Sequence, residues 1–137
     1  MAGRGSEVAR MNVESGKGLS WAISPDGSRI AVQSGERPHQ QIRILDLRRK
    51  TESTLKLPNW SVIWSSSWAA EGNALFASVS HMTSYQIVRI ELNGKTSVLL
   101  DRGRNQWLSS PVASSDGRHL GFTQQTFESN VWLLENY

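Results

Sequence analysis

The residues that could carry acid, base or metal chemistry are few and widely spaced. The chain has three histidines, His39, His81 and His119, and no cysteine. No histidine has a second one at ligand spacing, and without cysteine there is no disulfide, thiolate nucleophile or cysteine metal site. We expect surface histidines, no metal and no cofactor. The alternative is that His39 and His81, both in predicted loops, converge at one rim of the fold.

Short catalytic motifs are also missing. The sequence has no G-x-x-x-x-G-K-[ST] phosphate loop, no G-x-G-x-x-G dinucleotide loop, no H-E-x-x-H zinc helix and no G-x-S-x-G nucleophile elbow. Ser24-Pro25-Asp26-Gly27 does not match the spacing of a sialidase Ser-x-Asp-x-Gly-x-x-Trp box. We therefore predict no catalytic residue and no enzyme in this chain, with the activity of any longer parent left open.

Acidic residues recur next to glycine at a constant interval. The pairs are Asp26-Gly27, Glu71-Gly72 and Asp116-Gly117, each 45 residues after the last. Glycine supplies the positive φ of a tight reversal, and an acidic side chain can cap nearby backbone groups. The carboxylates are thus predicted to be structural turn residues.

The same interval extends through most of the chain. The segments SPDGSRIAV, AAEGNALFA and SSDGRHLGF occupy 24–32, 69–77 and 114–122. QIRILDL at 41–47 falls on QIVRIEL at 86–92, and NVWLLEN at 130–136 fits a third copy with one residue deleted. A fixed period of this length indicates a repeat architecture.

Each repeat is predicted to contain four strands. An apolar run leads into the acidic-Gly turn, and a second apolar run follows it, as in a hairpin. An alternating third segment and a fourth extended stretch, 53–57 in the first copy, come next. No window shows a helical period, so the chain is expected to be all-β. Repeats of about 40 to 45 residues with four antiparallel strands are the blades of β-propellers.

The predicted organisation is one β-propeller segment spanning 1–137. Residues 1–17 are expected to supply a lone fourth strand, 18–60 the first blade, 61–106 the second, and 107–137 a third blade lacking its fourth strand. Trp21, Trp64, Trp68 and Trp132 lie in predicted strands, where we expect them to pack between blades.

The repeat resembles the Pro-Asp-Gly type of WD-like repeat found in TolB-like bacterial propellers. The resemblance lies in SWAISPDGSRIAV, SSPVASSDGRHLGF and NVWLLENY. The chain is also similar to the C-terminal propeller segments of bacterial kinases and winged-helix regulators. The central copy departs from the pattern, with Ala70-Glu71-Gly72 where Pro-Asp-Gly is usual. The family's shared motif is structural, so the resemblance implies no catalytic residue.

Three blades are too few for a ring, since propellers have about four to eight. One 45-residue step back from 53–57 places the lone fourth strand at 8–12. It could complete the last blade of another copy, so that two chains would form a six-bladed homodimer. The rival interpretation is that the chain is a fragment of a longer propeller.

A binding surface is predicted where loops gather around the mouth of the ring. These loops join second to third strands, and fourth strands to the next blade. They carry Trp60, Trp107, Arg104, Arg37, His39, His81 and Phe127. Aromatic residues with arginine favour protein recognition. The alternative for Trp60 and Trp107 is that they fill the core.

Charge and hydropathy exclude some partners. The formal net charge is +3, and the tightest basic run, Arg48-Arg49-Lys50, is predicted to be a solvated turn. Only Arg102, Arg104 and Trp107 hint at a nucleic-acid surface, so we expect no nucleic-acid partner. No window approaches the roughly 20 apolar residues of a membrane helix. The segment MAGRGSEVARMNVESGKG lacks the apolar centre of a secretion signal. The sequence leaves the compartment open: we expect a cytoplasmic chain as written, and an extracytoplasmic place in a longer parent stays possible.

These features favour a non-catalytic protein-interaction or ligand-sensing propeller module of a bacterial regulatory protein. Its expected partner is another protein or a second copy that closes the ring. The alternative is an accessory propeller of a hydrolase, such as a prolyl-oligopeptidase-like peptidase.

Overall fold

The computed structural model describes residues 3–13, 20–58, 60, 62–128 and 131. In these residues the chain is all-β, with ten strands and no helix, which confirms the predicted fold class. Accordingly, no helix in the described part is long and apolar enough to cross a membrane.

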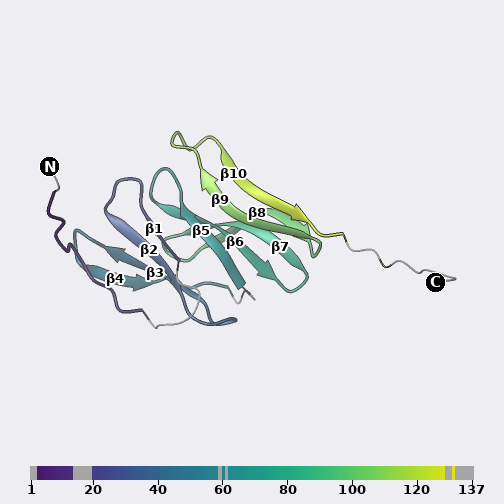
Figure 1. The fold of residues 1–137 in the computed structure, drawn as a ribbon, viewed down its shortest axis with the longest axis horizontal. Coiled ribbons are helices and arrows are strands. Elements are labelled where there is room, and N and C mark those ends of the chain that lie inside the picture. Colours follow the sequence, from purple (N-terminus) through teal and green to yellow (C-terminus); the bar gives the residue numbers. More distant parts are fainter. Residues whose placement is uncertain (1–2, 14–19, 59, 61, 129–130, 132–137) are drawn as a thin grey trace, which may run out of the picture.

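The strands form three antiparallel sheets that lie side by side (Figure 1). Blade 1 contains β1 (Ser20–Ile23), β2 (Arg29–Ser34), β3 (Gln41–Asp46) and β4 (Thr51–Thr54). Blade 2 contains β5 (Val62–Trp68), β6 (Ala74–His81), β7 (Ser84–Glu91) and β8 (Thr96–Gly103). Blade 3 is the hairpin of β9 (Gln106–Ala113) and β10 (Leu120–Thr126). The first strand of blade 2 lies next to the first strands of blades 1 and 3, as expected for inner strands of a propeller.

The strands of blades 1 and 2 fall inside the predicted spans 18–60 and 61–106, and β9 begins at the end of the second span. The predicted fourth stretch at 53–57 is strand only at its start, since β4 ends at Thr54, and the Leu55 side chain that follows is buried. Residues 3–13 form no strand within this single chain. Their pairing with a neighbouring blade stays a prediction, and the predicted third strand at 130–136 lies outside the described residues apart from Val131.

The first hairpin turn is held by a side-chain network. Gly27 has a φ of 71°, a backbone conformation that side chains with a Cβ rarely adopt. Its N–H donates to the Ser24 carbonyl at 2.8 Å. The Asp26 carboxylate accepts from the Ser24 hydroxyl at 2.7 Å and from the Ser28 N–H at 3.0 Å. The Ser28 backbone bond, followed by the two serine hydroxyls, holds the pKa of Asp26 well below its usual range.

The third copy of the turn repeats this network, and the second does not. Asp116 accepts from the Ser114 hydroxyl at 2.5 Å and from the Arg118 N–H at 3.1 Å, and these bonds lower its pKa. In the second copy Ala69 replaces the serine, and the turn keeps backbone bonds from the Gly72 N–H to the Ala69 carbonyl and from the Ala69 N–H to the Ala74 carbonyl, both at 2.9 Å. The predicted structural role is thus seen for Asp26 and Asp116, whereas Glu71 makes no such turn bond among the described residues.

Blades 1 and 2 share one buried apolar cluster. It contains Ala31, Ile42 and Ile44 of blade 1 and, among others, Trp68 and Leu75 of blade 2. Trp68 is 6% exposed, and its indole N–H donates to the Ala22 carbonyl of blade 1 at 2.9 Å. This tryptophan therefore packs between blades as expected.

Polar bonds also join neighbouring blades. The buried Gln33 amide of blade 1 donates to the Ile63 carbonyl of blade 2 at 2.7 Å. Between blades 2 and 3, the Ser110 N–H donates to the Ser65 hydroxyl at 2.9 Å, across one 45-residue step. Because each bond joins backbone to side chain, it fixes how one blade sits on the next.

Trp21 does not follow the expected packing. Its side chain is 65% exposed. It lies on the face of blade 1 that points away from blade 2, and no described blade covers that face. Trp132 lies outside the described residues.

We predict that Trp68→Phe lowers the free energy of unfolding by about 1–3 kcal/mol, because it leaves the Ala22 carbonyl without its donor and opens a small void. Trp107→Phe is the matched control. The buried Trp107 indole N–H has no hydrogen-bond partner among the described residues. Trp107→Phe should therefore lower the free energy of unfolding by about 1 kcal/mol or less. Denaturant unfolding measures both, and equal losses would contradict the role given to the interblade bond.

A second prediction concerns pH. Because the folded state lowers the pKa of Asp26, its stabilising effect is fully present above the unfolded pKa of about 4 and is lost as pH falls through the folded value. Asp26→Asn should therefore lower the melting temperature at pH 7 and flatten its fall below about pH 4. Glu71 lies at the equivalent turn but does not make these side-chain bonds. Glu71→Gln should therefore change neither the melting temperature at pH 7 nor its fall below about pH 4. A Glu71 variant as unstable as the Asp26 variant would refute this account.

Candidate interaction site

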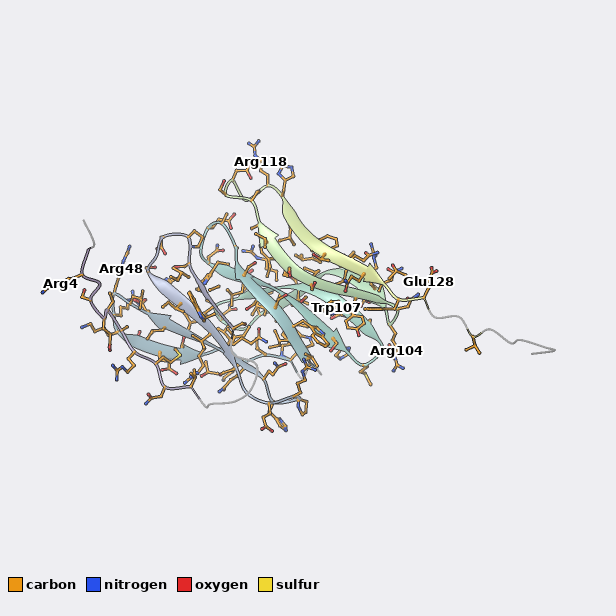
Figure 2. All side chains as sticks on the ribbon, in the orientation of Figure 1. Arg4, Arg48, Arg104, Trp107, Arg118 and Glu128 are labelled. Carbon is orange, nitrogen blue, oxygen red and sulfur yellow. The ribbon has the colours of Figure 1, made fainter. Side chains whose placement is uncertain are left out.

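The connections after the second and fourth strands gather at one end of the blades. They are residues 35–40 and the described residues 55–58 and 60 around blade 1, and 82–83 and 104–105 around blade 2. Arg104 and Trp107 lie close together at this end, whereas Arg118 lies at the opposite end of the β9–β10 hairpin (Figure 2). All seven predicted rim residues lie on or beside these connections, including Phe127, which follows β10.

An arginine and two tryptophans form the centre of this end. The Arg37 guanidinium lies over the Trp64 ring, 4.5 Å from its centroid. Trp64 in turn meets Trp107 edge-to-face, with centroids 5.7 Å apart and planes at 76°. Both contacts are of kinds that stabilise aromatic pairs and cation–aromatic pairs. The structure thus links two predicted residues, Arg37 and Trp107, through a third that the sequence had assigned only to packing.

A β-bulge explains why Trp64 was missed. The pairing of β5 with β6 shifts register between Ile63 and Ser65, so Trp64 is the extra residue. A bulge re-aims one side chain relative to its neighbours. The run VIWSSSW shows no alternation that would reveal the bulge. The only available signal was a large aromatic residue at a repeat position held by serine in the next copy, Ser109.

The indole N–H groups of Trp64 and Trp107 are both buried without a hydrogen-bond partner in the described part of the chain. Unpaired buried donors cost free energy and mark sites that a polar acceptor or ordered water would stabilise. Two such donors lie within one aromatic cluster. The cluster is therefore polar as well as apolar.

A hollow of about 280 Å³ lies beside the cluster, lined by Ser80, Met82, Ser84, Tyr85 and Arg104. It brings Arg104 next to the β6–β7 turn that follows His81. Asp101 borders the same turn and accepts from the Gln86 amide at 2.6 Å. The hollow therefore offers an arginine, hydroxyl groups and an apolar methionine to a ligand.

The remaining predicted residues are distributed differently. Phe127 is 60% exposed and its N–H donates to the Asn105 carbonyl at 2.9 Å, which holds it beside the β8–β9 connection. His39 and His81 are exposed, and among the residues that the structure describes they belong to no group of three metal-ligating side chains. Trp60 is 7% exposed and belongs to the cluster between blades 1 and 2. The Trp60 side chain therefore fills the core, as the alternative interpretation expected, and does not contribute to the binding surface.

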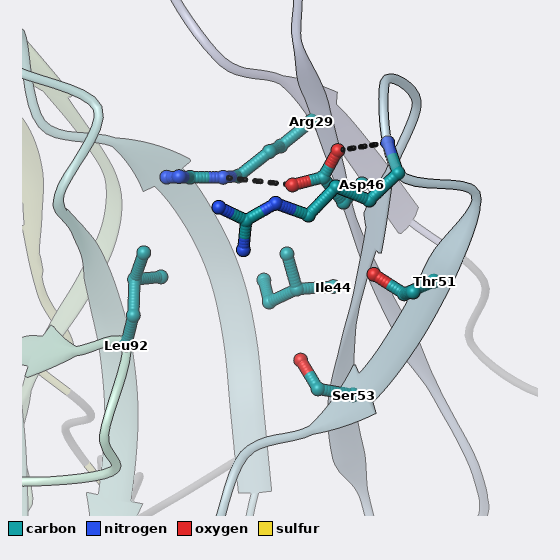
Figure 3. Close-up of a pocket in the computed structure, with 7 residues that line it drawn as sticks. Arg29, Ile44, Asp46, Thr51, Ser53 and Leu92 are labelled. Carbon is teal, nitrogen blue, oxygen red and sulfur yellow. Dashed lines mark hydrogen bonds and ion pairs between the residues drawn. The ribbon is translucent and has the colours of Figure 1, made fainter.

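A second hollow, of about 190 Å³, lies at the turn end between blades 1 and 2 (Figure 3). Asp46 accepts from the N–H groups of Arg49 at 2.9 Å and Arg48 at 3.0 Å, and pairs with Arg29 at 3.9 Å. The Arg49 backbone bond is the main cause that lowers the pKa of Asp46. A carboxylate held in this way is a turn cap, and the other polar side chains that line the hollow are Arg29, Arg49, Thr51 and Ser53.

Within the described residues, no group of three or more His, Asp or Glu side chains is placed to hold a metal ion. The side chains that the structure places at the loop end include arginines, tryptophans and hydroxyl groups.

Comparisons with known proteins bear on the fold. No family model matches the chain, and no curated protein matches it. The solved structure of putative TolB from Agrobacterium tumefaciens is similar, with a TM-score of 0.68 and 17% identity over 82% of this chain and 40% of that one. TolB from Acinetobacter baumannii is similar with a TM-score of 0.66 and 24% identity, over 85% of this chain and 29% of that one.

The chain thus has a TolB-like β-propeller fold and spans less than half the length of either neighbour. The expected resemblance to TolB-like propellers is confirmed at the level of fold. Neither neighbour is described as a kinase or a winged-helix regulator, so these comparisons give that part of the resemblance no support.

Proposed function

We propose that the chain is a non-catalytic protein-interaction or ligand-sensing propeller module of a bacterial regulatory protein. Its binding surface is the loop end with Arg37, Trp64 and Trp107 at the centre and the Arg104 hollow beside it. The observation that carries this proposal is the exposed Arg37 residue stacked on Trp64, in a tryptophan pair whose indole N–H groups have no hydrogen-bond partner among the described residues.

The composition of this surface supports protein recognition. Tryptophan and arginine are enriched among residues that dominate binding energy, because they bury large areas and also make directed polar contacts. Stacking on Trp64 holds the Arg37 guanidinium in one orientation, which reduces the entropy that a partner must offset on binding. An acidic peptide segment, with carboxylates for the arginines and an apolar side chain for the hollow, fits this chemistry.

Self-association is the second part of the proposal. Blades 1 and 3 each expose an apolar side chain on the face that no described blade covers, Ile23 at 52% and Val112 at 59%. Three blades do not close a ring. We propose that further blades cover these faces, and that a second copy supplies them. No described residue favours the alternative of an accessory propeller of a hydrolase.

A peptide library displayed on phage and selected on the immobilised chain tests the loop-end site. We predict enrichment of acidic peptides, and a loss of binding of about tenfold or more for Arg37→Ala, as expected for a hot-spot residue. Arg48→Ala, an exposed arginine at the turn end, is the matched control and should bind as the parent does. Equal binding by the two variants would place the site elsewhere.

A further inference from the structure

We propose that the open face of blade 1 is a docking site for the β9–β10 hairpin of a second copy of this chain, with Ile23 of one copy facing Val112 of the other. This inference rests on the proposed self-association and specifies the surfaces that meet. We call the face the docking face and define it by Trp21, Ile23, Ile30 and Val32.

The docking face is apolar and hollowed. Its four residues, together with Met11 and Val13 of the N-terminal segment, enclose a space of about 340 Å³. Trp21 is 65% exposed and Ile23 is 52% exposed, although both lie in a strand. Large apolar side chains that line an open hollow mark a surface that another apolar surface covers.

The repeat shows what kind of surface that is. Moving 45 residues along the chain takes Ile23, Ile30 and Val32 to Trp68, Leu75 and Ala77 of blade 2. These three are 6%, 0% and 0% exposed. They belong to the cluster that joins blade 2 to blade 1. In blade 2 the face equivalent to the docking face therefore packs against blade 1, the preceding blade of the same molecule.

The N-terminal segment occupies part of the place that a blade preceding blade 1 would take. The Arg43 guanidinium on β3 donates to the Asn12 carbonyl at 2.6 Å. One repeat later, Val88 and Leu57 occupy the equivalent positions, and Leu57 packs against the buried cluster that contains Val88. Residues 10–13 therefore contact blade 1 in the way that residues 55–58, which follow β4, contact blade 2. In blade 2 the strands of blade 1 fill the space next to this segment, and the hollow on blade 1 is the equivalent space.

Blade 3 carries the matching surface. In the interface between blades 1 and 2, Trp68 meets Ala22, where its indole N–H bonds the Ala22 carbonyl. Ile23 is one repeat before Trp68, and Val112 is two repeats after Ala22. Val112 is 59% exposed on β9. If the new interface reproduces the contact between Trp68 and Ala22, Ile23 takes the place of Trp68 and Val112 takes the place of Ala22, so that Ile23 lies against Val112.

A second copy is the occupant that fits both surfaces at once. The docking face and the Val112 surface lie at opposite ends of one row of blades, so two copies related by a two-fold axis cover all four open faces. Three blades from each copy give six, within the range of about four to eight that natural rings use.

Cysteine cross-linking tests this contact directly, because the parent chain has no cysteine. We predict that the full chain carrying Ile23→Cys and Val112→Cys forms a covalent dimer on mild oxidation, read as a doubled mass by intact mass spectrometry. A mixture of the two single variants should give one disulfide between unlike chains, whereas each single variant alone should stay uncrosslinked. In the single chain both positions are more than half exposed, so the reduced variants should keep the all-β fold of the parent, which circular dichroism checks.

The pair Ile23→Cys with Val98→Cys is the matched control, because Val98 is 56% exposed on the outer strand β8 and away from either face. Cross-linking of the control as efficient as that of the test pair would overturn the proposed contact. An uncrosslinked test pair in a chain that light scattering shows to be a dimer would overturn the docking surface but not self-association. An uncrosslinked monomer would overturn both, and peptide binding at the loop end would be unaffected by either outcome.

Discussion

Burial of both faces of each four-stranded sheet is the requirement on which this structure depends. A sheet with apolar side chains on its two sides is stable only when neighbouring layers cover them. In blade 2 the requirement is met, and Leu75, Val79 and Ile90 are completely buried. The indole of Trp68 and the amide of Gln33 add directed bonds across the interface, so that the apolar surfaces meet in one register. Blade 1 has the same pattern on a face that no described blade covers.

The two ends of the blades have separate roles that follow from this packing. At one end, the turns at Gly27, Gly72 and Gly117 repeat nearly the same backbone angle and are stabilised by local bonds. At the other end the connections differ in length and composition, and they hold the arginine and tryptophan cluster. Because the strands are fixed by burial and the turns by local bonds, these connections can vary without disturbing the fold.

The sequence was sufficient for the fold and only partly sufficient for the site. The 45-residue interval and the acidic-Gly turns predicted the blades because both reflect local backbone requirements that recur in each copy. The bulge at Trp64 was not predictable, since it depends on how β5 pairs with β6. The burial of Trp60 and the exposure of Trp21 also depend on which blade covers which face. Loops and open faces are set by tertiary contacts, so residue types there indicate chemistry without indicating position.

The central claim is that blades are completed by other blades of the same kind, and the solution mass of the purified chain tests it most directly. Light scattering after size exclusion should give a single species of twice 15.3 kDa. A single species of 15.3 kDa at every concentration would contradict the account, because the open apolar faces would then be stable in water without a partner.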